Sequence, residues 1–264
     1  MTAWYDVTGK PGINNHNRYE SSAAGVQPIE KITLTARRFY QVLAWAVHFY
    51  TALGLVAGLM AIDAIYRGEA QHVFIWLAVA AFIDATDGTL ARRFEVKRWA
   101  SQFDGCLLDN IIDFLNYTFI PVVFAYRFEL IPPSALPVLA LVLFASAYGF
   151  CITTAKTADG YFTGFPNYWN VMIFYFYLLE FPPLINALIM SIFVVLVFVP
   201  IRYISASTEK FRSITVVVMV LFGVALVIMG ATMYDVDKRL VVGSLVAATY
   251  YFVASFYLHL TEKP

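Results

Sequence analysis

Asp84-x-x-Asp87-Gly88-x-x-Ala91-Arg92, followed by Gly105-x-x-x-Asp109-x-x-x-Asp113, is the stretch that decides the fold and its chemistry. The aspartates are three residues apart in the first block and four apart in the second. Because residues at these spacings share one face of a helix, each block predicts an acidic patch about one turn long. Apolar segments flank both blocks, so the acidic patches are predicted on otherwise hydrophobic helices.

Carboxylates in or near a bilayer cost roughly 2.5 to 3.5 kcal/mol each on insertion scales, so a cluster of four indicates function. Four neighbouring carboxylates also repel one another unless cations neutralise them. A solvent-open site with oxygen ligands suits Mg²⁺ or Mn²⁺, which leave coordination positions for phosphate oxygens. Gly88 and Gly105 permit a close backbone approach by a ligand. Arg92 offers donors suited to phosphate, although a positive-inside anchor explains it equally well.

The two blocks together resemble the signature of the CDP-alcohol phosphotransferase family, and all eight fixed positions are present. The first block alone is also compatible with a solvated turn or a helix cap. The twelve-residue spacer from Arg93 to Asp104 is longer than in most members of the family. This spacer, and the segments 47–54 and 156–166, are similar to the branch that joins CDP-diacylglycerol to choline.

The resemblance implies an enzyme that transfers the phosphatidyl group of CDP-diacylglycerol to choline and releases CMP. It implies two Mn²⁺ or Mg²⁺ ions, held by Asp84, Asp87, Asp109 and Asp113. Asp113 would also be the catalytic base. The CDP-binding residues would be Asp87, Gly88, Ala91, Arg92 and Gly105. The resemblance further implies a homodimer.

Candidate choline-binding residues lie near the two blocks or at the start of the fifth apolar segment, where the loop after the fourth segment ends: Asp104, Asn116, Tyr117, Tyr168 and Trp169. An aromatic face binds a quaternary ammonium with roughly 0.5–2 kcal/mol. Tyr168 and Trp169 are also typical of the aromatic belt at a membrane interface. Asp104 either caps the helix that begins at Gly105 or attracts the cationic acceptor.

Two other functions remain open from the sequence. The same donor can serve another acceptor, namely serine, glycerol 3-phosphate or an inositol phosphate. Phosphorylated acceptors require additional basic residues, and the loop after the fourth apolar segment offers only Lys156, which favours a cationic acceptor. A divalent-cation transporter is less favoured, because transport requires polar residues along a path across the membrane and these four gather near one side.

The composition predicts an integral membrane protein. Of 264 residues, 60% are hydrophobic and 14% are charged, and the mean hydropathy is positive. These values lie outside the range of soluble domains. The eighteen basic and eighteen acidic residues balance, and no basic run or recognition motif indicates a nucleic-acid partner. Cys106 and Cys151 lack metal-type spacing and are expected to be packed thiols.

The fold class predicted is an all-α polytopic membrane protein with about eight transmembrane helices in one domain, residues 31–264. The apolar segments are 44–66, 70–91, 106–126, 133–155, 167–180, 182–204, 213–232 and 239–260. A crossing needs about 20 apolar residues, so segment 167–180 is short. Residues 31–43 have an amphipathic pattern typical of an interfacial helix, after a polar cytoplasmic tail at 1–30.

The distribution of basic residues predicts the orientation. With eight spans and the N-terminus in the cytoplasm, fourteen of the eighteen Lys and Arg residues lie on the cytoplasmic side. Both termini and the acidic site are therefore predicted on the cytoplasmic side of a bacterial inner membrane.

Overall fold

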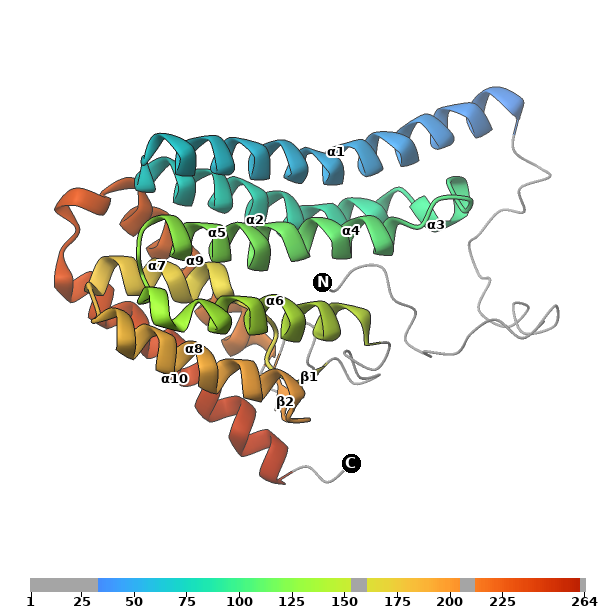
Figure 1. Cartoon of the computed structure of the whole chain (residues 1–264). Coiled ribbons are helices and arrows are strands. Elements are labelled where there is room, and N and C mark those ends of the chain that lie inside the picture. The colour runs from blue at the N-terminus through green and yellow to red at the C-terminus, as the bar shows by residue number, and fades with distance from the viewer. Residues whose placement is uncertain (1–32, 153–160, 205–211, 262–264) are drawn as a thin grey trace.

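The computed structural model describes residues 33–152, 161–204 and 212–261, which form a helical bundle with one short pair of strands (Figure 1). Six helical stretches are long and apolar enough to cross a membrane. They are Leu34–Arg67 (α1), Ala70–Arg93 (α2), Gly105–Arg127, Pro133–Cys151, Arg212–Ala231 (α9) and Lys238–Thr261 (α10). The predicted all-α polytopic membrane fold is therefore confirmed. The predicted tail 1–30 lies outside the described residues.

Two of the eight predicted spans form shorter helices. Trp169–Leu179 (α7) has 11 residues and Pro183–Phe198 (α8) has 16. At 1.5 Å per residue, α7 is only about 16 Å long, against about 30 Å for the hydrocarbon core of a bilayer. Pro183 begins α8 and Glu180 ends α7 with a positive φ of 50°, so the two helices form a hairpin.

The helix α1 runs without a break over 34 residues, from the capping residue Thr33 to Gly68. The predicted interfacial helix 31–43 and the first span are therefore parts of one helix. No proline separates them, and glycine appears only within the span. The first turns of α1 extend beyond the bundle beside α3 (Val96–Trp99), where Tyr40 stacks on Trp99 with ring centroids 5.0 Å apart.

The third span changes its helical geometry in the middle. It consists of α4 (Gly105–Asp113), a π-helical turn η2 (Phe114–Phe119) and α5 (Ile120–Arg127). The Nδ2 of Asn116 in this turn donates to the carbonyl oxygen of Gly54 in α1, at 3.1 Å. Isolated π-turns are rare and occur frequently at functional sites.

Small residues let α1 approach the third span closely. A Cβ atom on Gly54 would lie 2.7 Å from Cγ2 of Ile112, and one on Gly58 would lie 2.9 Å from Oδ1 of Asn116. Glycines four residues apart are a common device for close helix contact in membranes. The packing of α1 against α4 and η2 therefore depends on these two positions.

The chain reaches α7 through the non-helical segment 161–168. Here β1 (Phe162–Thr163) pairs antiparallel with β2 (Arg202–Tyr203). Gly164 follows with a φ of 82°, and a Cβ there would lie 2.4 Å from the backbone oxygen of Val197. Non-helical backbone is tolerated at membrane depth only where protein covers it, and most of this segment is buried. The segment thus continues the path of the short helix α7.

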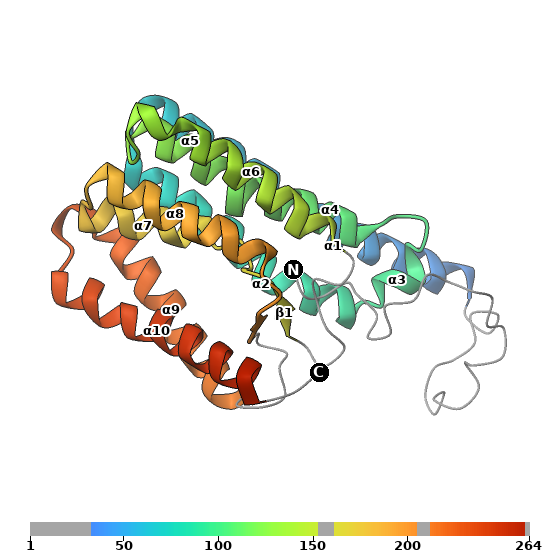
Figure 2. The same cartoon turned by 60° about the horizontal axis from the view of Figure 1, so that its bottom comes forward.

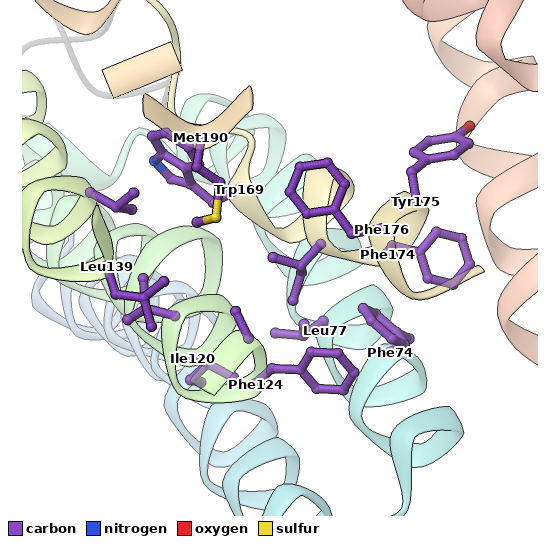
Figure 3. Close-up of a cluster of buried hydrophobic side chains, with 14 of the residues drawn as sticks. Phe74, Leu77, Ile120, Phe124, Leu139, Trp169, Phe174, Tyr175, Phe176 and Met190 are labelled. Atoms are coloured by element: carbon purple, nitrogen blue, oxygen red, sulfur yellow. The ribbon is translucent and has the colours of Figure 1, made fainter. Parts of the chain in front are cut away.

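Aromatic and aliphatic side chains from α2, α5, α6 (Leu136–Cys151), α7 and α8 meet in one hydrophobic core (Figure 3). The ring of Phe74 lies 4.8 Å from that of Phe124 and 4.7 Å from that of Phe174. The helices α9 and α10 form a separate pair beside α7 and α8 (Figure 2). The core therefore fixes the centre of the bundle, and the carboxy-terminal pair lies at its side.

Candidate active site

Carboxylates from two helices meet at one point of the bundle. One oxygen each from Asp84 in α2 and from Asp109 and Asp113 in α4 lie within 4.8 Å of one another. Asp109 and Asp113 share a face of α4 because they are one turn apart. The extensive contact between α1 and α2, together with the packing of α1 on the third span and of α2 on η2, brings this face opposite Asp84. The two acidic patches therefore meet as the sequence predicted.

Asp87 lies one turn further along α2 and is 1% exposed. It lines a cavity of about 10 Å³ together with the other three aspartates and Thr51 of α1. A cavity of this size holds about one water-sized particle. The Oδ2 atom of Asp87 is buried and has no hydrogen-bond partner among the described residues. Leaving a buried carboxylate oxygen unsatisfied is costly, so this atom calls for a cation or a donor.

These four residues fit a divalent cation on the evidence of this geometry. The donors are all carboxylate oxygens, which suit Mg²⁺, Mn²⁺ or Ca²⁺ rather than metals that prefer sulfur or imidazole. Three of the oxygens converge, and a fourth carboxylate lines the same cavity with an unsatisfied oxygen. The cluster can therefore hold a metal ion.

A tyrosine from the π-turn holds one of the carboxylates. The hydroxyl of Tyr117 donates to Oδ2 of Asp84 at 2.8 Å. Hydroxyl groups of α1 and α2 also meet nearby, since the Tyr50 hydroxyl and Thr86 Oγ1 are 2.7 Å apart. The motif gave no role to Thr51 or to the contact between Tyr117 and Asp84. The position of Thr51 and the contact between Tyr117 and Asp84 become visible only in the three-dimensional packing of the helices.

The predicted CDP-binding residues gather where α2 ends and α4 begins. Asp87, Gly88 and Ala91 are buried on α2, and Gly105 is the buried first residue of α4. Arg92 is exposed instead, and its Nη2 donates to Oγ1 of Thr89 at 3.0 Å. Gly88 and Ala91 thus follow Asp87 within about one turn of α2, and Gly105 precedes Asp109 by about one turn of α4, while the guanidinium lies at the surface.

The structure separates the predicted choline-binding residues. Tyr117 and Tyr168 line one apolar cavity, and Asn116 lines the small acidic cavity. Asp104 caps α4, since its Oδ1 accepts from the backbone nitrogen of Leu107 at 3.0 Å. Trp169 is fully buried in the core, where its Nε1 donates to Oγ of Ser146 at 2.8 Å. Tyr117 therefore shares the apolar cavity with Tyr168 and the acidic cavity with Asn116, whereas Asp104 and Trp169 line neither.

Fold and site together define a multi-pass membrane protein with a cluster of carboxylates between its helices that can hold a cation. No family model matches the chain. The chain is 40% identical to the phosphatidylcholine synthase of Borreliella burgdorferi over 182 residues, which cover 68% of this chain and 78% of that protein. It is 41% identical to the phosphatidylcholine synthase of Legionella pneumophila over 172 residues, 62% of this chain and 65% of that protein.

A third relative, the phosphatidylcholine synthase of Pseudomonas aeruginosa, is 42% identical over 144 residues, 54% of this chain and 60% of that protein. The chain belongs to the phosphatidylcholine synthase family. This membership agrees with the resemblance of its two aspartate blocks to the CDP-alcohol phosphotransferase signature.

Proposed function

We propose that this chain is a CDP-diacylglycerol–choline O-phosphatidyltransferase, which joins the phosphatidyl group of CDP-diacylglycerol to choline and releases CMP. The observation that carries the proposal is the convergence of Asp84, Asp109 and Asp113 among apolar helices, with oxygens within 4.8 Å. It is supported by 40% identity to a phosphatidylcholine synthase. Such chemistry belongs in a membrane bundle, because the acyl chains of the donor need a hydrophobic environment while its headgroup reacts.

Asp84, Asp87, Asp109 and Asp113 would hold two divalent cations, Mn²⁺ or Mg²⁺. When bound, a pair of such ions neutralises the diphosphate and stabilises the entering and leaving oxygens. The unsatisfied buried oxygen of Asp87 supports the assignment of this residue to the set. The hydroxyl of Tyr117 would orient the Asp84 carboxylate for this purpose.

Asp113 acts as the general base. The hydroxyl of choline is a weak nucleophile near neutral pH, so a carboxylate about 3 Å away is needed to accept its proton. The choline oxygen forms a bond to the phosphorus that carries diacylglycerol, and the bond from this phosphorus to CMP breaks. Asp113 takes the proton, and the products are phosphatidylcholine and CMP.

The small residues near the cluster bind the nucleotide part of the donor. Gly88, Ala91 and Gly105 leave space beside the carboxylates for the CMP group. Arg92 is exposed next to them, and its guanidinium has donors for phosphate beyond the one directed at Thr89.

Tyr117 and Tyr168 bind the trimethylammonium group of choline. A quaternary ammonium offers no N–H donor, so aromatic faces supply its attraction, at about 0.5–2 kcal/mol for each contact. The two tyrosines line the same space, and Tyr117 also contacts Asp84. Trp169 is excluded from this pocket because the core buries it.

The reaction takes place on the cytoplasmic side of a bacterial inner membrane, with both termini in the cytoplasm. The excess of basic residues on that side supports this orientation. The connections α1–α2, α5–α6, α7–α8 and α9–α10 lie at the end opposite to α3 and the strand pair, as an even number of crossings requires (Figure 1). The protein acts as a homodimer, as the family resemblance implies.

The direct test uses purified protein in detergent with labelled CDP-diacylglycerol and Mn²⁺. Choline, serine, glycerol 3-phosphate and inositol phosphate are supplied one at a time. Labelled lipid is expected with choline alone, with an equal amount of CMP released. Lipid formed from another acceptor instead would overturn the choline assignment. Metal flux through proteoliposomes without any release of CMP would indicate a transporter.

A further inference from the structure

A large apolar cavity of about 1010 Å³ lies between α2, α7, α9 and α10. It is about a hundred times larger than the acidic cavity, and it is at the upper end of the range for small-molecule sites, about 300–1,000 Å³. Protein interiors are packed closely, with few voids larger than a water molecule. A space of this size is therefore part of the architecture of the bundle.

The walls of the cavity are hydrocarbon and aromatic. Phe74, Leu77 and Phe82 line it from α2, and Gly223 and Leu226 from α9. No charged side chain among the described residues lines it. Away from its end at Tyr117 and Tyr168, the cavity suits an aliphatic chain rather than a polar metabolite.

Hydrogen bonds join α9 to α10 and to α2 while the cavity between these helices stays open. The hydroxyl groups of Thr215 and Tyr250 are 3.1 Å apart and join the two helices. Gln71 of α2 donates to the backbone oxygen of Ala231 at 2.7 Å. These contacts hold α9 in place without filling the apolar cavity.

The cavity begins at the acidic site. Tyr117 lines both the large cavity and the acidic cavity, and its hydroxyl donates to Asp84 at 2.8 Å. Tyr168 lies at the same place, with its ring centroid 6.0 Å from that of Tyr251 in α10. One side chain thus separates the carboxylates from the apolar space.

The size and the opening of the cavity match a membrane lipid. Its lining extends along α9 from Thr215 to Ile228, which is about 20 Å at 1.5 Å per residue. One leaflet of a bilayer is about half of the 30 Å hydrocarbon core, so about 15 Å is enough for an acyl chain. Phe82, Val220 and Val224 line the cavity and are also more than half exposed, so it opens sideways toward the bilayer.

We infer that this cavity binds an acyl chain of the diacyl donor, and that the α9–α10 pair sets the chain length that the enzyme accepts. The inference rests on the proposed function, because the donor must have its phosphates at the carboxylates for its chain to enter here. In this arrangement the carboxy-terminal pair takes no part in the chemistry and acts as a wall of the lipid site.

A cavity-filling substitution tests the inference. Gly223 lines the cavity and a Cβ atom there meets nothing within 4 Å, so Gly223→Phe is expected to place its ring in the open space. The variant is assayed with CDP-dipalmitoylglycerol and with CDP-dioctanoylglycerol. We expect the kcat/KM ratio of the long-chain donor to the short-chain donor to fall by about tenfold or more, since misfitting methylenes in a hydrophobic pocket have effects of this size.

Gly243→Phe is the matched control. Gly243 is on α10, also has open space at its Cβ, and does not line the cavity. This variant should keep the parent ratio, and Gly223→Leu should fall between the parent and Gly223→Phe. An unchanged ratio in Gly223→Phe, with the thermal unfolding temperature preserved, would overturn the inference and place the chains in the bilayer. Failure of the parent protein to use either donor would instead contradict the proposed function.

Discussion

The third span and the carboxy-terminal pair of helices are packed in opposite ways. In the third span, 50% of the most apolar window is buried inside the protein, against 17% in α9 and in α10. Gly54 meets Ile112 of the third span with no room for a side chain, whereas Gly223, Gly230 and Gly243 have open space. Carboxylates that bind a metal must be held at fixed positions, while a wall against hydrocarbon need only exclude water. Tight packing therefore coincides with the carboxylate cluster, and loose packing coincides with the apolar cavity beside the carboxy-terminal pair.

The largest expected effect is the loss of activity when an aspartate of the acidic cluster is replaced, compared with replacement of an aspartate outside it. Asp113→Asn should lower CMP release by about 10²–10⁴-fold, because an amide cannot accept the proton of choline. Asp63→Asn is the control, since Asp63 is half-exposed on α1 and pairs with Arg67 at 3.0 Å. The measurement is CMP release by protein with an unchanged elution profile. Activity of Asp113→Asn within tenfold of the parent would exclude this residue as the base.

The second prediction concerns how firmly the third span holds the metal ligands. Tyr117→Phe removes the hydrogen bond to Asp84 and should raise the Mn²⁺ concentration for half-maximal activity by about tenfold or more. Tyr126→Phe changes an exposed tyrosine of the same span and should leave that concentration unchanged. If both variants need the same Mn²⁺ as the parent, Tyr117 does not position the ligand.

The packing contrast itself can be measured. Gly54→Leu should lower the free energy of unfolding by about 1–3 kcal/mol, because the new side chain collides with Ile112. Gly243→Leu, in open space on α10, should be neutral or slightly stabilising, since leucine favours a helix more than glycine does. Thermal unfolding in detergent checks both variants. Equal destabilisation of the two would contradict the contrast.

The smallest effect concerns the cap of α4. Asp104→Ala should lower stability by about 1 kcal/mol, because Leu107 loses the acceptor of its backbone N–H. Asp104→Asn should retain stability, since asparagine caps a helix as well as aspartate does. The KM for choline should match the parent in Asp104→Asn. A higher KM in this variant, with stability preserved, would show instead that the charge attracts the acceptor.

The sequence predicts the convergence of the acidic side chains because the signals for it are local. Asp109 and Asp113 share a helix face by spacing alone, and Asp84 and Asp87 follow the same rule. The position of Tyr117 was less predictable, because it depends on the π-turn η2 directly after Asp113, and no feature of the local sequence indicates a π-turn. Its pairing with Asp84 depends on the packing of α2 against this turn.

The fifth predicted span, 167–180, is helical from Trp169 to Leu179, as its short apolar pattern predicts. The sequence does not indicate that β1, in the segment before it, pairs with β2 some forty residues away. Trp169 looked like an interfacial residue, and Ser146 of α6 gives its indole N–H a partner inside the core. Neither of these long-range contacts can be inferred from the local sequence.

The π-turn adds one residue to the third span while the helix that follows keeps its orientation. A π-turn closes with hydrogen bonds from i to i+5, one residue more than an α-turn, so it needs about one more residue for the same rotation about the helix axis. Deleting one residue from Phe114–Phe119 and restoring α-helical bonding would therefore leave the downstream residues, including the buried Phe124 beside Phe74, in nearly the same orientation. The change would fall on the turn itself, where Tyr117 donates to Asp84. The turn thus presents an additional side chain at the acidic cluster and preserves the packing of α5.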